Sequence, residues 1–570
     1  MKTRRHSLIP IYLGAFIAAA THSMAAQPSS PQTIAGLGTA TFPTSTHSPE
    51  AQTEFIRGLL LLHTFEYDDA AKAFQAAEKT DPTFAIAYWG EAMTHNHPVW
   101  NELDVPAGQA ALNKLASTPE ARAASVADPR QKAFLSSVEI LYTGQGTKPE
   151  RDALYATAMQ KLAQTYSKDD EAQLFYSLAL LGRSEAVRDV PTYLQAAAIA
   201  KAAYDRNPNH PGAAHYWIHG MDDPDHAAGA LVAARSLSKI APDAGHAQHM
   251  CSHIFMALGM WQAVVDANIQ AMKVVDDQAR AAGRPIVDCG HYVIWLQYAY
   301  DQQGRHEDAN RVLASCQSTG KQAADAMDAH SGHTSSSDHA RQRRADRTNA
   351  SLVTMRGTAV IESGQGNSPA ASMVVDTASL GPDTGWDAFT TGYAAAQRGD
   401  LPAAQAAQNR LLQITQTTHA DAKAEKETAT YLDILSDDLG GLIASKTGDM
   451  PAAIKQVQRA AVTYDSMAFD FGPPAIFKPP QELLGELLLK DGKPQQAREA
   501  FESSLKRAPN RSLSLLGLAR AQDAAGDKVA AATTYKQLLA NWKSADSGNP
   551  DVAEAKHYVA ADKKLASASN

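Results

Sequence analysis

The stretch EFIRGLLLLHTFEYDDAAKAFQAAEKTDP, residues 54–82, spaces small, aromatic and proline residues in a way that suits two packed helices. Small residues let antiparallel helices approach closely, an aromatic ring fills the gap between them, and proline ends the second helix. The stretch therefore predicts one helical hairpin. In a 34-residue frame that begins at Ala51, the deciding residues are Gly58 at position 8, Ala70 at 20, Phe74 at 24, Ala77 at 27 and Pro82 at 32.

The same frame returns near the end of the chain. Residues 482–510, ELLGELLLKDGKPQQAREAFESSLKRAPN, place Gly485, Phe501 and Pro509 at positions 8, 24 and 32. In the middle of the chain, two prolines that lie 34 residues apart mark further units. The other units that follow this frame are 177–210, 211–244, 245–278, about 290–321, 389–412, 439–461 and 515–542.

A period of this length and pattern resembles the tetratricopeptide repeat, whose helix pairs stack into a solenoid. We therefore expect an all-α fold of the tetratricopeptide type, a helical-hairpin solenoid that forms a superhelix of antiparallel helix pairs. Changes of composition along the chain indicate its divisions. The predicted segments are a signal peptide at 1–26, a disordered lead-in at 27–50, an N-terminal array with a histidine cluster at 51–327, a polar loop at 328–350, middle repeats at 351–468, and a proline-rich connector with C-terminal repeats at 469–570.

The N-terminus has the features of a cleaved secretory signal: basic residues at 2, 4 and 5, an apolar stretch, and small residues at Ala25 and Ala26. No later stretch is apolar enough for a membrane span. We therefore expect a periplasmic or secreted protein with no membrane span. Cleavage takes the formal net charge from −9 to −12, because the removed segment holds three basic residues and no acidic ones. This acidic balance argues against nucleic acid as a partner, and leaves a small molecule or peptide in the concave groove, or a partner protein.

The histidines recur with the repeat. His215 and His249 both take position 5 of their units, and His219 and His253 both take position 9. His246 takes position 2 of its unit. In tetratricopeptide arrays, positions 2, 5, 9, 12 and 13 line the concave face. The frame therefore predicts that these five histidines share one surface.

This pattern suits a metal site. Histidines four residues apart lie on one face of a helix and can bind the same ion, and neighbouring helices are close enough for their imidazoles to meet. The predicted metal ligands are His215, His219, His246, His249 and His253, and imidazole ligands suit zinc, copper or iron. The alternative is that these histidines are polar groove residues that bind a peptide.

Residues 207–261 also resemble a group of exported bacterial tetratricopeptide proteins that share HYxIH, DDPxHA and HAxHMxSHIF segments. The resemblance implies fold and export and leaves the chemistry open. Here the segments read HYWIH, DDPDHA and HAQHMCSHIF. On the matching positions the resemblance points to His215, His219, Asp223, His226, His246, His249 and His253.

The function that these residues suggest is a metal-dependent hydrolase or oxidase. Asp222 or Asp223, at positions 12 and 13, would act as general base, and His226 would act as proton shuttle or outer partner. No serine hydrolase, HExxH or nucleotide-binding motif is present in the sequence. Two alternatives stay open: a periplasmic scaffold that binds proteins or peptides without catalysis, and a protein that stores or delivers metal.

Several residues have more than one interpretation. His63, His95 and His97 either face the central histidines across the groove or lie far from them, and His291 takes position 2 of the unit after an insertion. Cys251 falls on the buried side of its helix and is interpreted as core packing. The remaining two cysteines, Cys289 and Cys316, are able to form at most one disulfide.

Overall fold

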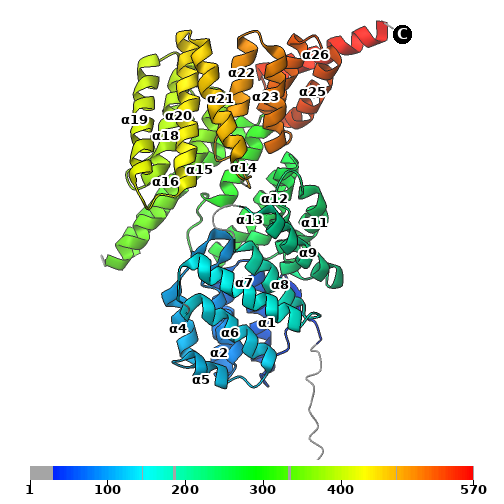
Figure 1. Cartoon of the computed structure of the whole chain (residues 1–570), viewed down its shortest axis with the longest axis vertical. Helices are drawn as coiled ribbons and strands as arrows, with labels where there is room; N and C mark the ends of the chain where they lie inside the picture. The colour runs from blue at the N-terminus through cyan, green and yellow to red at the C-terminus, as the bar shows by residue number, and fades with distance from the viewer. Residues whose placement is uncertain (1–29, 144, 184–187, 331–334, 470, 569–570) are drawn as a thin grey trace, which may run out of the picture.

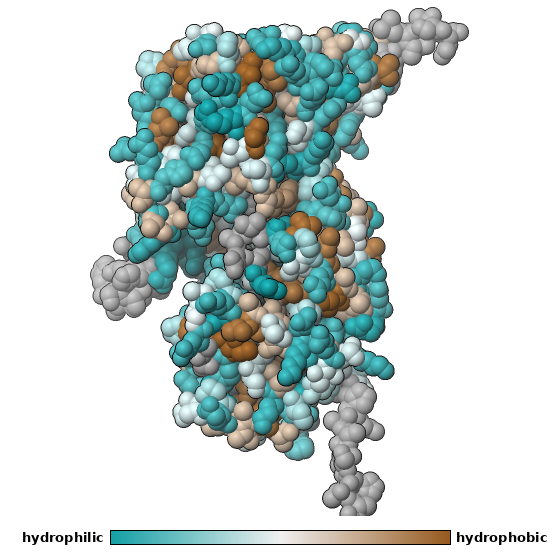
Figure 2. Space-filling model, in the orientation of Figure 1, coloured by the Kyte–Doolittle hydropathy of each residue, from teal (hydrophilic) through white to brown (hydrophobic). Residues whose placement is uncertain are grey.

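The computed structural model describes residues 30–143, 145–183, 188–330, 335–469 and 471–568. The predicted signal peptide, 1–26, lies outside them. Figure 1 shows two helical lobes, one built from the first half of the chain and one from the second, which meet near α12, α13 and α14. Figure 2 shows that hydrophilic side chains cover most of the face in view and that the molecule narrows between the lobes.

The first lobe contains two short antiparallel hairpins and a series of helix pairs. Its strands are β1 Gln32–Ile34, β2 Gly38–Ala40, β3 Asn96–His97 and β4 Glu102–Leu103. Its helices are α1 Pro49–His63, α2 Tyr67–Thr80, α3 Ala85–Met93, α4 Val105–Leu115, α5 Pro119–Ala124, α6 Pro129–Thr143, α7 Lys148–Thr165, α8 Asp170–Leu181, α9 Val190–Arg206, α10 Pro211–Gly220, α11 Leu231–Ile240, α12 Gly245–Ala257 and α13 Trp261–Ala281.

The second lobe continues the helix pairs to the C-terminus. Its helices are α14 His291–Gln302, α15 His306–His330, α16 Ser335–Ser363, α17 Pro369–Ser372, α18 Thr384–Arg398, α19 Leu401–Ala420, α20 Lys426–Thr447, α21 Met450–Ser466, α22 Pro480–Lys490, α23 Pro494–Arg507, α24 Ser512–Ala524, α25 Lys528–Asn541 and α26 Pro550–Ala568.

The packing within the hairpins follows the frame read from the sequence. Phe74 lies against Gly58 of α1 and Gly90 of α3, where an added Cβ atom would come closer than 3.0 Å to its ring. Phe501 is enclosed in the same way by Gly485 and Gly517. Consecutive helices pack as neighbours along most of the chain, while α4 packs on α3 and α6. The predicted fold class, an all-α solenoid of the tetratricopeptide type, is confirmed.

The described part of the lead-in is ordered, which corrects the expectation of disorder over 27–50. Strands β1 and β2 pair, with Gln32 opposite Ala40. Beyond them, Phe42 is buried against the rings of Phe55 and Phe134, at centroid distances of 5.0 and 5.2 Å. Burial of this one aromatic side chain outweighs the disorder that proline, serine and threonine favour.

The segment 328–350 also differs from expectation. We expected a polar loop, but α15 extends to residue 330 and α16 begins at residue 335. Residues 331–334 lie outside the described residues. The sequence ARQRRADRTNA, residues 340–350, is rich in alanine and arginine, which are strong helix formers, so a polar composition here still permits helix.

The C-terminal repeats fold back onto the first lobe through the turn between α23 and α24. The indole Nε1 of Trp261 donates to the Asn510 carbonyl oxygen at 3.0 Å, and Asn510 donates to the Gly259 carbonyl oxygen at 2.8 Å. Next to this turn, the buried Arg511 binds the carboxylates of Glu362 and Glu482. These contacts hold the turn between α23 and α24 against the end of α12 and the start of α13.

Candidate metal centre

The first helices of two adjacent repeats, α10 and α12, place the recurring histidines side by side. The Nε2 atoms of His215 and His219 lie 3.1 Å apart on α10, and those of His249 and His253 lie 3.2 Å apart on α12. The rings of His219 and His253 approach across the two helices with centroids 5.8 Å apart. The structure thus brings together the four histidines that the frame predicted to meet.

Two further histidines complete two groups of three. His246, at the start of α12, joins His215 and His219 to form the first triad. His291, at the start of α14, joins His249 and His253 to form the second triad. Within each triad, one nitrogen from each histidine lies within 4.8 Å of the other two. His291, whose place the sequence left open, therefore belongs to the cluster.

Hydrogen bonds fix the protonation of three of these rings. The Nδ1 atom of His215 lies 2.7 Å from the His63 carbonyl oxygen, and that of His253 lies 2.5 Å from Asp222 Oδ2. The Nδ1 atom of His249 lies 2.7 Å from Asn268 Oδ1. These oxygens only accept hydrogen bonds, so in each neutral ring the hydrogen is on Nδ1.

The orientation of the Asn268 amide is itself fixed, because its Nδ2 donates to the Val264 carbonyl oxygen at 2.8 Å. The Nε2 atoms of His249 and His253 therefore face each other with a lone pair each. Two lone pairs at this distance repel unless a cation lies between them. In the first triad, the buried Nε2 of His246 has no hydrogen-bond partner among the described residues.

Burial disfavours the charged form of four histidines of the cluster. It lowers the pKa of His215 to about 3. Burial, with neighbouring histidines adding to the effect, also holds the pKa values of His219, His246 and His249 well below the ordinary value of 6.5. Neutral imidazoles with inward-facing lone pairs are the form that binds transition metals.

The cluster is covered, whereas the frame predicted side chains in an open groove. Phe65 packs on the first triad, with its ring centroid 4.3 Å from that of His215. Trp295 and Phe471 lie against His253 at 4.3 and 5.4 Å. Side chains from other repeat units and from the proline-rich connector fill the groove at this level, so the five predicted ligands are all buried.

A third histidine group nearby is satisfied without a metal. His63 and His210 each contact one oxygen of the buried Glu171, at 2.7 and 2.9 Å. The other nitrogen of His63 pairs with the Tyr216 hydroxyl, and that of His210 accepts from the Ala213 backbone N–H. Because every nitrogen has a partner, we interpret this group as structural. His63 contributes to the cluster only through its carbonyl oxygen.

The other two N-terminal histidines lie apart from the cluster. His97 stacks on Tyr67, with centroids 4.0 Å apart, and contacts Glu102. His95 lines a separate surface pocket with His97 and Glu102.

The predicted acids contact the cluster from outside. Asp222 is buried and reaches it only through Nδ1 of His253. Asp223 pairs with Arg188 at 2.8 Å and accepts from His226 Nδ1 at 2.7 Å. Outer carboxylates of this kind orient a metal-binding histidine and increase its basicity. Catalytic roles for Asp222, Asp223 and His226 stay predictions.

A pocket of about 400 Å³ leads from the surface to one histidine of each triad, His246 and His291. Glu66 lies in its wall, and its Oε1 accepts from the His246 backbone N–H at 2.9 Å. Burial raises the pKa of Glu66. Its neighbour Phe65 has a left-handed backbone with φ of 59°, which is rare for a bulky residue.

Sequence comparison identifies the repeat. A family model described as tetratricopeptide repeat matches residues 483–550, from α22 to the first residue of α26. This part of the chain consists of tetratricopeptide repeats. The sequence matches no curated protein.

Solved structures of tetratricopeptide proteins resemble this one only distantly. A chain of the complex Cut9–Hcn1 of APC/C is 12% identical, with 89% of this chain and 75% of that chain covered and a TM-score of 0.32. Human IFIT1, in a dimer with m7Gppp-AAAA, is 12% identical over 87% and 91% of the two chains, with a TM-score of 0.29. Yeast Tom70 is 11% identical over 90% and 96%, with a TM-score of 0.27. This likeness is too low to suggest partners or ligands.

Two of the three cysteines form a disulfide, and the third is a free thiol. Cys289 and Cys316 form a disulfide that joins the residue before Gly290 to α15. Because His291 begins α14 two residues later, the disulfide anchors the third ligand of the second triad. Cys251 is buried with a free thiol, as predicted for core packing.

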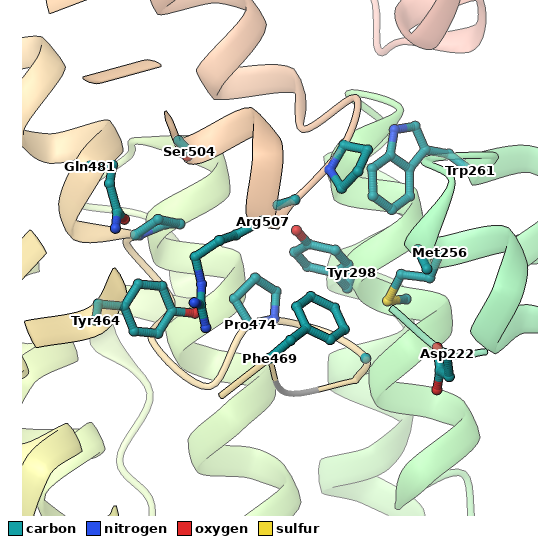
Figure 3. Close-up of a pocket in the computed structure, with 15 residues that line it drawn as sticks. Asp222, Met256, Trp261, Tyr298, Tyr464, Phe469, Pro474, Gln481, Ser504 and Arg507 are labelled. Atoms are coloured by element: carbon teal, nitrogen blue, oxygen red, sulfur yellow. The ribbon is translucent and has the colours of Figure 1, made fainter. Parts of the chain in front are cut away.

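A second, smaller cavity of about 40 Å³ lies on the far side of Asp222, between the two lobes. Figure 3 shows Tyr298, Phe469 and Arg507 pointing into it, with Asp222 at its edge. The C-terminal repeats therefore help to shield the carboxylate that holds His253. No helix in the described part of the chain is long and apolar enough to cross a membrane.

Proposed function

We propose that this tetratricopeptide-repeat protein is an exported metalloenzyme whose histidine cluster holds a transition metal. The observation that carries the proposal is the pair His249 and His253, whose Nε2 lone pairs face each other at 3.2 Å. Two nitrogens on one tetrahedral ion, with bonds of about 2.1 Å, lie roughly 3.4 Å apart. The protein thus holds these nitrogens at the spacing that an ion requires. Zinc, copper and iron all suit such ligands.

The pocket favours an enzyme over a storage or delivery protein. A metal with an open coordination position supplies either an activated water for hydrolysis or a binding site for dioxygen. His246 and His291 face a pocket that is large enough for a small substrate. A storage site has no use for such an approach.

The protein's own residues would prepare this chemistry. The outer partners Asp222 and Asn268 hold the rings of His253 and His249 with Nε2 inward. Phe65 excludes water from the first triad. Glu66 is the carboxyl group in the pocket wall that is placed to accept or donate a proton there, although its bond to His246 N–H also caps α12. Asp223 and His226 form a second proton-transfer pair at the rim.

Export is supported by the signal-like N-terminus and by the disulfide, because disulfides persist in oxidising compartments. We expect the mature protein to begin after Ala25 or Ala26. N-terminal sequencing of protein recovered from the periplasm or medium tests this, and an uncleaved chain in the cytoplasm contradicts it.

Elemental analysis of the purified full chain tests the metal. Wild type should retain zinc, copper or iron in stoichiometric amount, and a His215→Ala, His249→Ala variant should lose it. The matched control replaces two exposed histidines, His419→Ala and His557→Ala, and should keep the metal. If wild type holds no ion after exposure to all three metals, the proposal is wrong and a peptide-binding scaffold becomes the better account.

A second measurement separates an enzyme from a carrier. The cobalt-loaded protein should change its visible spectrum when azide is added, because azide binds an open coordination position. An unchanged spectrum means a closed site, and then storage or delivery of metal is favoured.

A further inference from the structure

The two triads are copies of one site, made by the repeat. In each triad, two histidines come from positions 5 and 9 of one unit and the third comes from position 2 of the next unit. The first triad takes His215 and His219 from unit 211–244, then His246. The second takes His249 and His253 from unit 245–278, then His291. Three ligands thus recur as a set.

From this duplication we infer that the protein binds two metal ions, one in each triad. The inference rests on the proposed function, which requires only that metal is bound. The two inferred sites are neighbouring groups of three histidines, and each suits a divalent transition metal. Both sites open to the same pocket, because His246 and His291 line it.

One ion cannot serve all six histidines. Two nitrogens bound to the same ion lie at most about 4.2 Å apart, twice the length of a metal–nitrogen bond. The facing nitrogens of His215 and His219 converge at 3.1 Å, and those of His249 and His253 converge separately at 3.2 Å. An ion between the nitrogens of one pair leaves the nitrogens of the other pair facing each other. The two pairs therefore offer two separate places for a cation.

The rings of the two triads are neighbours. Across the triads, the centroids of His219 and His253 are 5.8 Å apart, and those of His246 and His249 are 6.0 Å apart. Within the second triad, the centroid of His291 is 4.5 Å from that of His249 and 6.3 Å from that of His253. The triads are thus adjacent, and the two ions would be neighbours in one cavity.

The charges around the two sites differ, so the ions should bind unequally. His253 of the second triad contacts the carboxylate of Asp222 at 2.5 Å. The Nδ1 atom of His215 in the first triad contacts a neutral carbonyl oxygen, and the guanidinium of Arg188, which pairs with Asp223, lies 3.4 Å from the carbonyl oxygen of His219. A carboxylate favours a nearby cation and a guanidinium opposes it. The second triad should therefore fill first.

Titration of the metal-free full chain with cobalt(II) tests the inference. Cobalt bound after desalting is counted by elemental analysis, and its visible bands follow each step. Wild type should bind two equivalents in two steps. A His215→Gln, His219→Gln variant should retain the tighter equivalent, and a His249→Gln, His253→Gln variant should retain the weaker one. Glutamine keeps a polar side chain in these buried positions, and circular dichroism checks that each variant is folded.

The number of cobalt equivalents bound distinguishes two metal sites, a single shared site and no metal site. If wild type binds one equivalent and either double variant abolishes it, the six histidines share a single site: the inference of two ions is overturned and the proposed function stands. If wild type binds no cobalt, zinc or copper, the proposed function itself fails. If a double variant does not fold, the single variants His219→Gln and His253→Gln replace it, and each should lose one of the two steps.

Discussion

His249 and His253 lie one helical turn apart on α12, and their Nε2 atoms are 3.2 Å from each other, with a lone pair on each when both rings are neutral. Asn268 and Asp222 each take the Nδ1 hydrogen of one ring. This arrangement is costly in a protein without a bound cation, because buried polar atoms without partners cost roughly 1 to 3 kcal/mol each. We therefore interpret the cluster as prepared for metal.

Removing the amide that orients His249 should weaken metal binding. Asn268→Ala takes away the acceptor of the Nδ1 hydrogen, so the ring is free to rotate or to change tautomer. We expect cobalt affinity in the second triad to fall by roughly 10- to 100-fold. Asn268→Asp keeps an acceptor and should stay near wild type. Competition with a chelator measures both, and equal affinities for Asn268→Ala and wild type would contradict this role of Asn268.

The metal-free protein should lose stability as the pH falls from 7.5 to 5.5. The pKa of His215 is lowered to about 3, from an ordinary value of 6.5, and those of His219, His246 and His249 are also lowered. Between these values the unfolded chain binds more protons than the folded chain, so the stabilisation is present above pH 6.5 and decreases below it. Each such histidine contributes up to about 1.4 kcal/mol over this whole interval.

Urea unfolding at the two pH values measures this effect. A His215→Gln, His249→Gln variant lacks two of the four titrating groups and should lose less stability than wild type over the same interval. An equal loss in both proteins means that the cluster does not titrate on unfolding.

Breaking the disulfide should affect one triad more than the other. The bond closes a loop across a sequence separation of 27 residues, which the chain-entropy model values at roughly 3 to 4 kcal/mol. In a Cys289→Ser, Cys316→Ser variant, His291 loses its anchor, so the second triad should bind cobalt more weakly while the first triad is unchanged. Cys251→Ala, which leaves the disulfide intact, is the control. A uniform loss of both sites would indicate general unfolding instead.

The N-terminal segment should contribute strongly to stability. Phe42 is buried among Phe55, Trp89 and Phe134, and the guanidinium of Arg130 lies 4.0 Å from its ring centroid. Phe42→Ala should cost about 3 to 5 kcal/mol, the usual effect of removing a buried aromatic ring. His47 is an exposed residue in the same segment, and His47→Ala should change the free energy of unfolding by less than about 0.5 kcal/mol. Thermal unfolding compares the two, and similar midpoints would mean that the segment is not docked in solution.

The repeat frame explains why the fold and four of the ligands were predictable from sequence. A helix places positions 5 and 9 on one face, and a constant period places the same face of the next unit beside it. His215, His219, His249 and His253 follow from these two facts. His246 follows as position 2, whereas an insertion before His291 interrupts the count and leaves its place open.

The partners of the cluster were not predictable in this way. Asn268 lies on the second helix of its unit, and the carbonyl oxygen that fixes His215 belongs to His63, 152 residues earlier in the chain. Glu66 approaches His246 across 180 residues. Contacts of this kind depend on how the superhelix closes on itself, and no periodicity in the sequence records that closure.

Two corrections have the same cause. Phe42 in the lead-in and the alanine-rich part of α16 lie in segments whose overall composition is polar. Composition averages over a segment, whereas one buried ring, or one run of helix-forming residues, is enough to order it. The isolated aromatic residue at position 42 was the signal that this average concealed.

Anomalous diffraction from crystals of the zinc-loaded full chain, recorded on both sides of the zinc absorption edge, tests the central claim most directly. We predict an edge-specific peak about 2.1 Å from both Nε2 atoms of His249 and His253, and a second peak in the same relation to His215 and His219. Two results together would contradict this prediction. The zinc peaks would lie only on surface histidines or acids, and one of the rings of His249 and His253 would be rotated so that the two imidazoles form a hydrogen bond.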